Sequence, residues 1–398
     1  MQHNGSSNKV PKTWLGYRRP DGQVGGRNFL LMLSGTLYAN CVCERVSDMT
    51  FNTIPVVHPL GRCQVMPDLR LTVRTLIGMG KNPNCGAVIV VDHHKETGCE
   101  AEEIAHEIAK TGKPVAAINI RSSGGVIEAT AQALRTALDF HRKISGQRRE
   151  EVPVSDLVFG MNCGTSDTTS GISSNKAVGI VCDLVIDQGG RSILAETTEM
   201  LGGEEVLVAR AATAAVGEKI WFITKRMEKR ALESGEDIRG SQPTGDNILG
   251  GLSSIEEKSL GAIQKSGTKP IVDVVEFAEG IGKTPGLYIM DTPGHGGESI
   301  TGIAAAGSQV LTFSTGGGHT INHPAMTTIR LTGNRISYEK MKDTVEVDVS
   351  DIFDGTPIEE AGIRLYNEVI DTASGKLTKC EILKEHNAMA IHRIGISI

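Results

Sequence analysis

Residues 162–167, Asn-Cys-Gly-Thr-Ser-Asp, place a thiol, a carboxylate and two hydroxyl groups within six positions. The apolar run 157–161 before them has the composition of a buried strand, and a helical pattern follows at 175–189. Open α/β sheets bind ligands where such strands end, although an ordinary turn rich in Ser and Gly is the alternative. The candidate site residues of this segment are Asn162, Cys163, Ser166, Asp167 and Asn175.

Three thiols lie on separate loops that follow predicted strands: Cys63, Cys99 and Cys163. Three such thiolates can hold an iron–sulfur cluster and leave one iron open to substrate. With His58, His93 or His94 they can instead hold a divalent metal. Each thiol can equally be a small buried hydrophobic residue, and no paired C-x-x-C motif decides between these interpretations.

Carboxylates and a histidine supply the candidate acids and bases. Glu196 and Glu199 follow the predicted strand 192–195 and are either general bases or helix caps. Glu100 begins a helix, where the helix dipole favours a carboxylate in any case. His94 is an acid/base group, a metal ligand or a surface residue.

Two loops and one arginine have the composition expected for holding a substrate carboxylate. One loop begins at Asp291 and reads Asp-Thr-Pro-Gly-His; the other contains Thr315 and Gly316 and reads Ser-Thr-Gly-Gly-Gly. A Gly-rich loop exposes backbone N–H groups that can bind an anion. It lacks the lysine of a P-loop, so nucleotide binding is not predicted. Arg27 is either an anion-binding residue or a surface charge.

Alternating strands and helices must position these loops. The predicted strands are 29–34, 54–57, 87–91, 115–120, 157–161, 192–195, 271–275, 286–290, 309–313 and 329–331. The predicted helices are 69–79, 101–110, 125–142, 175–189, 204–234, 255–263 and 359–371. The pattern predicts an α/β fold with two mostly parallel, Rossmann-like domains and a site at the carboxyl ends of their strands.

The length of 398 residues predicts more than one domain, because single cores rarely grow past about 250–300 residues. The charged stretch 143–153 is the predicted linker. It divides the chain into a loose N-terminal lead-in (1–15), a first α/β domain (16–150) and a second α/β domain (151–398).

Composition argues against several classes of protein. A net charge of -6 leaves no basic surface for nucleic acid. No apolar run reaches the ~18 residues of a membrane helix, and the polar start has no signal-peptide core, which predicts a cytoplasmic protein. In that reducing compartment the eight cysteines are buried residues, metal ligands or nucleophiles.

Eight motifs occur in order over nearly the whole chain. They are G-Y-R-R-P-D-G-Q-V-G-G-R-N from Gly16, R-T-L-I-G-M-G-K-N-P-N-C-G-A-V-I-V-V from Arg74, G-C-E from Gly98, N-C-G-T-S-D-T-T-S-G-I-S-S-N from Asn162, E-T-T-E from Glu196, G-G-L-S-S-I-E-E-K-S-L-G-A from Gly250, M-D-T-P-G from Met290 and F-S-T-G-G-G from Phe313. Together they resemble the altronate and galactarate dehydratases and the large subunit of sulfolactate sulfo-lyase.

This resemblance implies iron-dependent β-elimination from a small anionic 2-hydroxy acid, such as a sugar acid or sulfolactate. A base removes the proton next to the carboxylate, a metal polarises the leaving hydroxyl group, and the enol becomes a 2-oxo acid. In the sulfo-lyase the leaving group is sulfite. The implied cofactor is iron, as Fe²⁺ or an iron–sulfur cluster, with Mn²⁺ or Zn²⁺ as alternatives.

The chain also departs from the family pattern. The family's H-x-x-G-C-G reads H-P-L-G-R-C here, which displaces Cys63 by one position. Family dehydratases often carry an additional β-rich N-terminal domain, so we expect this chain to be a large subunit with a small β-rich partner subunit, and to form a homo-oligomer.

We therefore predict a lyase. Its metal ligands would be Cys63, Cys99, Cys163 and His58. Its acid/base candidates would be Asp167, Glu100, Glu196 and His94. Its substrate contacts would be Arg27, Asn162, Ser166, Asn175, Asp291, Thr315 and Gly316. Two alternatives are a metal-dependent hydrolase, with zinc on His93, His94 and His295, and a binding subunit whose chemistry lies in a partner chain.

Overall fold

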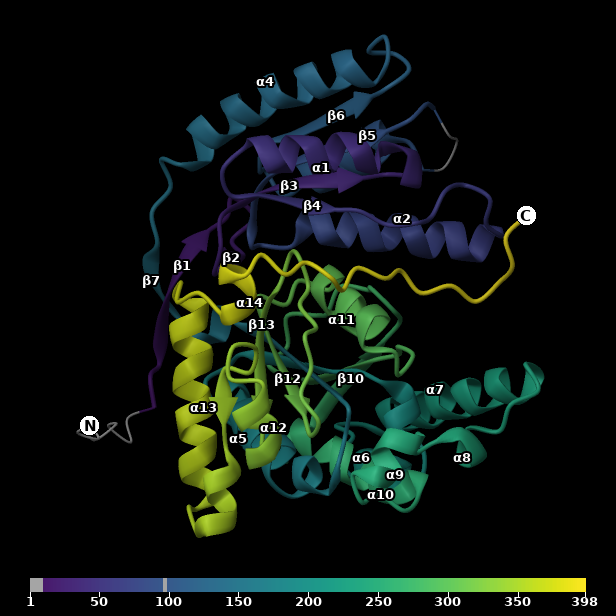
Figure 1. Ribbon diagram of the computed structural model, residues 1–398, viewed down its shortest axis with the longest axis vertical. Coiled ribbons are helices and arrows are strands. Elements are labelled where there is room, and N and C mark those ends of the chain that lie inside the picture. Colours follow the sequence, from purple (N-terminus) through teal and green to yellow (C-terminus); the bar gives the residue numbers. More distant parts are fainter. Residues whose placement is uncertain (1–9, 96–98) are drawn as a thin grey trace.

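Two parallel β-sheets with helices on their faces make up the chain (Figure 1), and the computed structural model describes residues 10–95 and 99–398. The first sheet has four parallel strands in the order β4-β3-β5-β6. All of β5 is buried, as is typical of a central parallel strand rich in Val and Ile. The strands are β3 Phe29–Ser34, β4 Thr53–Val56, β5 Cys85–Asp92 and β6 Val115–Asn119.

Alternate residues of β3 face two different helix layers, because side chains alternate along a strand. Leu30 and Met32 pack with α1 and α4, whereas Leu31 and Leu33 pack with α2 and α3 on the other face. Burial on both faces explains the uninterrupted apolar sequence of this strand. The helices are α1 Asn40–Met49, α2 Met66–Lys81, α3 Ala101–Ala109 and α4 Val126–Ile144.

The second sheet has seven parallel strands in the order β10-β11-β9-β8-β12-β13-β14, which confirms the predicted α/β fold with parallel sheets. β8 lies at its centre, between β9 and β12, with Cys163 paired to Ser314. The strands are β8 Val158–Gly164, β9 Arg191–Leu194, β10 Ile271–Val275, β11 Gly286–Met290, β12 Val310–Thr315, β13 Thr327–Thr332 and β14 Val347–Asp348.

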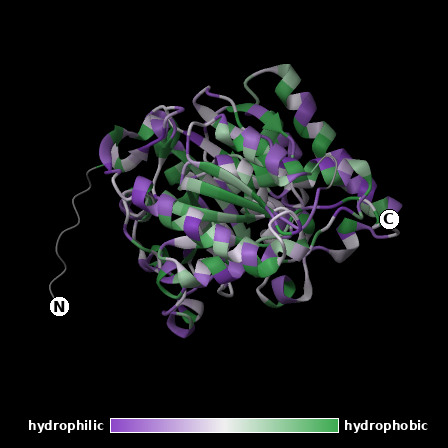
Figure 2. Cartoon of the chain, turned by 90° about the horizontal axis from the view of Figure 1, so that it is seen from above, coloured by the Kyte–Doolittle hydropathy of each residue, from purple (hydrophilic) through white to green (hydrophobic). Residues whose placement is uncertain are grey.

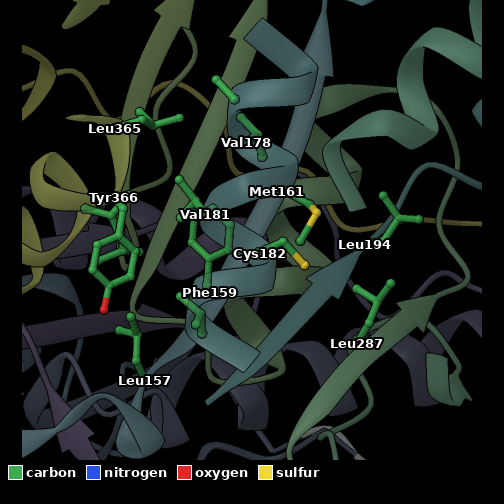
Figure 3. Close-up of a cluster of buried hydrophobic side chains, with 14 of the residues drawn as sticks. Leu157, Phe159, Met161, Val178, Val181, Cys182, Leu194, Leu287, Leu365 and Tyr366 are labelled. Carbon is green, nitrogen blue, oxygen red and sulfur yellow. The ribbon is translucent and has the colours of Figure 1, made fainter. Parts of the chain in front are cut away.

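One face of this sheet packs against α5 (Asn175–Asp187) and α13 (Ile358–Ala373). Figure 3 shows the core that they form, with Leu157, Phe159, Met161, Val178, Val181, Cys182, Leu194, Leu287, Leu365 and Tyr366. In Figure 2 the strands of the interior are predominantly hydrophobic, while hydrophilic residues gather on the surrounding helices.

The other face packs against α11 (Gly296–Ala305), which also contacts α2 of the first sheet. The two helices approach so closely that a Cβ on Gly78 would lie 2.4 Å from the backbone oxygen of Ala305. One hydrophobic cluster therefore continues from the first sheet to the second. The remaining helices are α6 Glu204–Val208, α7 Ala214–Glu233, α8 Ile238–Ser241, α9 Gly245–Leu249, α10 Ile255–Ile263, α12 Arg335–Lys340 and α14 Lys379–Ile382.

A small antiparallel sheet joins the start of the chain to the connection between the two parallel sheets. In it β1 (Thr13–Arg18) pairs with β2 (Val24–Gly25) and with β7 (Glu150–Pro153). The predicted linker therefore ends in a strand, and the predicted lead-in contains the first residues of β1; its residues 1–9 lie outside the described part of the chain.

Further differences from the predicted elements concern helices. The predicted helix 204–234 is two helices, α6 and α7, separated by residues 209–213. No helix was predicted at the positions of α1, α8, α9, α11, α12 and α14. The C-terminal segment after α14 runs along the boundary between the two parallel sheets (Figure 1). No helix among the described residues has the length and apolar character needed to cross a membrane.

Candidate active site

The Asp167 carboxylate fixes the shape of the loop after β8. Its Oδ1 accepts hydrogen bonds from Thr169 Oγ1 at 2.7 Å and from the Ser170 backbone N–H at 2.9 Å. Its Oδ2 accepts one from Asn334 Nδ2 at 2.9 Å. Gly316, after β12, lies against the same carboxylate, because a Cβ there would be 2.2 Å from Asp167 Cγ. The loops after β8 and β12 therefore meet, as the parallel-sheet hypothesis predicted.

A buried group at the end of β8 combines a thiol, two carboxyl groups and an ammonium group: Cys163, Glu196, Glu199 and Lys265. Cys163 Sγ lies 2.9 Å from Glu199 Oε2 and 3.1 Å from Lys265 Nζ. Glu196 Oε2 accepts a hydrogen bond from the Cys163 backbone N–H at 3.0 Å and lies 3.0 Å from Lys265 Nζ. None of the four is more than 9% exposed, so their charges interact with little screening by water.

This environment drives the pKa values of the two carboxyl groups apart. Burial raises the pKa of Glu196 to about 8, although the Lys265 ammonium acts in the opposite direction. Burial also opposes the ionisation of Glu199, but Lys258 and Lys265 outweigh it and hold the pKa of Glu199 below its usual value. At neutral pH Glu196 therefore keeps its proton and Glu199 is ionised. Such a separation identifies an acid and a base in one site.

The thiol and the ammonium group respond to the same surroundings. Burial, together with the two nearby carboxyl groups, raises the pKa of Cys163 well above its ordinary value. Burial lowers the pKa of Lys265, but Cys163 and the two carboxyl groups raise it more, so the net shift is upward. Lys265 is therefore a permanent cation in this arrangement, and Cys163 is a thiol at neutral pH.

Lys258 connects the buried group to a cleft of about 310 Å³. Its Nζ lies 3.4 Å from Glu199 Oε1 and 2.8 Å from Gln242 Oε1. The cleft is at the lower end of the range of small-molecule sites, about 300–1,000 Å³, which suits a small organic acid. Its walls include Ser166, Asp167, Asn175 and Lys258.

All nine predicted site residues of the second domain gather around the carboxyl edge of the seven-stranded sheet. They are Asn162, Cys163, Ser166, Asp167, Asn175, Glu196, Asp291, Thr315 and Gly316. Asp291 is already engaged, since Oδ1 accepts from Thr197 Oγ1 and Oδ2 accepts from Arg226 Nη2. Its predicted contact with substrate would require one of these bonds to break.

Arg27 is equally engaged, and this counts against its predicted role in substrate binding. All five of its guanidinium N–H groups donate within the protein, to the Glu381 carboxylate and to three backbone oxygens. The side chain is buried. Arg27 thus joins the start of the chain to the region around α14 and has no donor left for a substrate.

The remaining predicted site residues follow strands of the first sheet. His58 uses both ring nitrogens on backbone groups, with Nε2 3.0 Å from Ser34 O and Nδ1 3.2 Å from Leu60 N, and burial lowers its pKa to about 4. A metal bond from His58 would have to replace one of these contacts. Cys63 is exposed, Cys99 is buried directly before α3, and Gly98 of the G-C-E motif lies outside the described residues.

Glu100 and His94 also lie beside the first sheet. Glu100 is the residue before α3, and its side chain makes no capping hydrogen bond to that helix. His94 Nδ1 lies 2.9 Å from the Lys95 backbone oxygen. Both therefore occupy loops after β5, and their predicted acid/base roles stay predictions.

The Cys163, Glu196 and Glu199 side chains can hold a metal ion. Within the described part of the chain they are the one group of three Cys, His, Asp or Glu side chains whose ligand atoms all lie within 4.8 Å of one another. Cys63, Cys99 and His58 do not belong to it. Neither do His93, His94 and His295, so the hydrolase alternative is not favoured.

Sequence reasoning missed the two lysines of the site. Lys258 lies on α10, and Lys265 lies in the 3-10 turn after that helix, so neither follows a strand. Lys258 does fall inside the G-G-L-S-S-I-E-E-K motif. That motif could have indicated a role for Lys258, because it matches the family pattern although it does not follow a predicted strand.

Two family models match the chain. The "D-galactarate dehydratase/Altronate hydrolase, second domain" model covers residues 16–145, and the "D-galactarate/Altronate dehydratase, C-terminal" model covers residues 154–397. The "(2R)-sulfolactate sulfo-lyase subunit beta" of Chromohalobacter salexigens is 38% identical over 94% of this chain and 95% of its own length.

Two longer relatives match as well. The "Altronate dehydratase" of Bacillus subtilis is 29% identical over 97% of this chain and 79% of its own length. The "Galactarate dehydratase (L-threo-forming)" of Escherichia coli is 29% identical over 95% of this chain and 76% of its own length. The chain therefore belongs to the D-galactarate/altronate dehydratase family, whose named members are lyases.

Proposed function

We propose that this chain is a lyase that removes water or sulfite from a small 2-hydroxy acid, such as a sugar acid or sulfolactate, and releases a 2-oxo acid. The names of its relatives support this reaction class. The observation that carries the proposal is the arrangement of two buried carboxyl groups, Glu196 and Glu199, around the Cys163 thiol and the Lys265 ammonium group, beside a cleft of about 310 Å³.

The two carboxyl groups divide the work of the elimination. Glu199, the ionised one, accepts the proton next to the substrate carboxylate. Glu196, which holds a proton at neutral pH, donates it to the leaving hydroxyl group. Lys258 in the cleft wall, together with Lys265 behind it, stabilises the negative charge that develops on the substrate as its proton leaves. Asp167 keeps the loop around the cleft in shape.

We also propose iron as the metal of this site, with Mn²⁺ or Zn²⁺ as alternatives. Cys163, Glu196 and Glu199 would hold it, because a thiolate with carboxylates suits borderline divalent metals and Glu196 Oε1 is buried without a hydrogen-bond partner. The Lys265 ammonium now lies 3.1 Å from the thiol sulfur. It must therefore move or lose its proton when a metal binds. A bound metal would displace the proton of Glu196, so it would supply Lewis-acid polarisation of the leaving group in place of that proton. Glu199 would bind the metal through Oε2, beside the thiol, and keep Oε1, beside Lys258, for proton transfer.

A mononuclear ion fits this group better than a cluster, because the group contains one thiol. The cluster on Cys63, Cys99 and Cys163 remains a prediction. Iron content, sulfide content and the visible absorption spectrum of anaerobically purified protein decide between the two. Stoichiometric sulfide with a broad visible band would overturn the mononuclear proposal.

We propose in addition that the chain works with a small β-rich partner subunit and forms a homo-oligomer. The support is the sulfo-lyase relative, which is named "subunit beta" and aligns with 94% of this chain. The proposed division into units 16–150 and 151–398 accords with the boundary between the two family models. Light scattering of the purified chain, and activity with and without a small subunit, test the assembly.

A substrate panel tests the reaction. Iron-loaded protein is supplied anaerobically with altronate, galactarate and sulfolactate, with 2-oxo acid and sulfite measured separately. Glu199→Gln should abolish turnover of any accepted acid, because it removes the proposed base. A second variant, Cys163→Ser, removes the proposed thiol ligand. Its matched control is Cys43→Ser, which changes a buried thiol in the core of the first sheet. Full turnover by Glu199→Gln would refute the proposed site.

A further inference from the structure

The Glu196 backbone adopts a conformation that a glutamate does not choose by itself. Its φ of 70° and ψ of 66° lie in the left-handed region, which is sterically unfavourable for residues with a Cβ. The residue is fully buried, at the turn between β9 and the short 3-10 helix Thr197–Met200. Such conformations persist only where the surrounding structure enforces them. Something at this turn must therefore hold Glu196 in place.

The end of β11 provides that constraint, because four hydrogen bonds join it to the Glu196 turn. Thr292 Oγ1 accepts from the Glu196 backbone N–H at 2.8 Å, and Thr292 O accepts from the Thr197 N–H at 2.9 Å. Thr197 Oγ1 accepts from the Thr292 N–H at 3.2 Å and donates to Asp291 Oδ1 at 2.5 Å. All four residues are buried. The two neighbouring strand ends thus form one cross-linked unit.

Asp291 extends this unit to helix α7. Its Oδ2 accepts a short hydrogen bond from Arg226 Nη2, while Arg226 also pairs with the exposed Glu276 and lies over the Phe222 ring at 4.9 Å. Both Asp291 oxygens are therefore engaged by side chains of the protein. The sequence predicted Asp291 as a substrate contact, and its two bonds point to a different role.

We propose that Arg226, Asp291 and Thr197 are positioning residues that hold Glu196 in its left-handed conformation and so direct its carboxyl group toward Cys163 and Lys265. The chain of contacts runs from α7 through Asp291 to the Thr197 hydroxyl, and from Thr197 to the turn. Without the Asp291 carboxylate, the Thr197 hydroxyl loses its acceptor and Glu196 relaxes to an ordinary conformation. Its carboxyl group then turns away from the thiol and the ammonium group.

The substitutions Asp291→Asn and Thr197→Val test this inference with little change of volume. Asn keeps one acceptor oxygen, so it cannot accept from both Thr197 and Arg226 with separate oxygens, and Val removes both hydrogen bonds of the Thr197 hydroxyl group. Thr197→Ser keeps the hydroxyl group and should behave as wild type. Asp273→Asn is the matched control. The exposed Asp273 side chain pairs with Lys219 of the same helix α7, at 2.6 Å, but lies on the edge strand β10. That control should leave every measurement unchanged.

Hydrogen exchange followed by mass spectrometry gives a readout that needs no substrate. In Asp291→Asn and Thr197→Val, peptides covering residues 195–200 should exchange faster, while peptides from β8 and the thermal midpoint stay close to wild type. A crystal structure of Asp291→Asn should show Glu196 outside the left-handed region. Unchanged exchange at 195–200, or faster exchange throughout the protein, would overturn the inference.

Kinetics add a second readout, which rests on the proposed function. Displacing a reacting group by about 1 Å can cost about 10²-fold in rate, so kcat of Asp291→Asn should fall by about that factor while KM stays close to wild type. If wild type turns over none of the acids, the proposed function fails but the exchange test still stands. If wild type is active and Asp291→Asn raises KM alone, Asp291 binds substrate and the positioning role is wrong.

Discussion

Replacing Glu196 with Gln removes the one carboxyl group of the site that is held in its protonated form. Gln has nearly the size of a protonated Glu and does not ionise. Its carbonyl oxygen can accept from the Cys163 N–H and from Lys265, as Glu196 Oε2 does. Its amide nitrogen then takes the place of Oε1, which is buried without a partner. We expect this unpaired group to cost about 1–3 kcal/mol at every pH.

The larger contribution to the stability difference between wild type and Glu196→Gln comes from the pH dependence of the wild-type unfolding free energy. A free glutamate has a pKa of 4.5, and burial raises that of Glu196 to about 8 in the folded protein. Below pH 4.5 both states carry the proton; between 4.5 and about 8 only the folded state does, so stability falls as pH rises. At about 1.4 kcal/mol per pH unit, the loss over this window is about 5 kcal/mol at most. Gln at position 196 removes this loss.

Urea unfolding of the metal-free proteins between about pH 5.5 and about pH 8.5 measures the effect. We expect the stability of Glu196→Gln relative to wild type to rise steadily with pH across this range. Glu204→Gln is the control, since it changes a buried glutamate outside the group. If the stability difference between Glu196→Gln and wild type stays constant across this range, Glu196 ionises normally and cannot be the acid.

Three further substitutions have defined outcomes. Lys265→Met should raise the affinity for Mn²⁺ about tenfold or more (about 1.4 kcal/mol), because it removes a cation 3.0–3.1 Å from two ligand atoms. Calorimetry measures this affinity, and weaker binding would make Lys265 part of the metal site. Gly316→Ala should destabilise the protein by about 1–3 kcal/mol and lower kcat, because its Cβ would lie 2.2 Å from Asp167 Cγ. Wild-type stability and kcat would show that the close approach of Gly316 to Asp167 is not needed for folding or turnover. Arg27→Met should cost about 3–5 kcal/mol in unfolding free energy at most, since it leaves the partly buried Glu381 carboxylate without its guanidinium partner, with KM unchanged. A raised KM at wild-type stability would restore Arg27 as a substrate contact.

The parallel strands were predictable because most of them are short, mainly apolar segments, and the central ones are buried on both faces. Predicted strands 29–34, 271–275 and 286–290 match β3, β10 and β11 at both ends. α11 escaped prediction because it begins with Gly296 and Gly297, which are typical of turns and not of helices. The linker 143–153 looked like an unstructured connection because its strand, β7, is short and charged and pairs only at the edge with β1.

Part of the site was predictable for the same reason. Cys163, Glu196 and Gly316 each follow a strand, and β9, β8 and β12 are neighbours in a parallel sheet, so their carboxyl ends meet. Lys265 was not predictable, since it reaches the group from a helix end 102 positions after Cys163, through the packing of helices. Arg27 shows that sequence can also suggest a site residue whose donors are used elsewhere. An arginine beside Gly residues has the same local sequence whether it binds a substrate anion or, as here, the Glu381 carboxylate.

The protonated state of Glu196 separates the two reactions that the family relationship leaves open. Hydroxide is a poor leaving group and needs a proton as the bond to carbon breaks, whereas sulfite departs as a stable anion without one. If this chain removes water with the Glu196 proton and without a bound metal in its place, its kcat should fall as pH rises through about 8, the pKa of Glu196, and Glu196→Gln should be nearly inactive. If it removes sulfite, both the alkaline limb and the effect of Glu196→Gln should be small, because the ionised Glu199 alone carries the proton transfer. A large loss of sulfite release in Glu196→Gln, with Glu199 intact, would show that Glu196 acts before the leaving group departs.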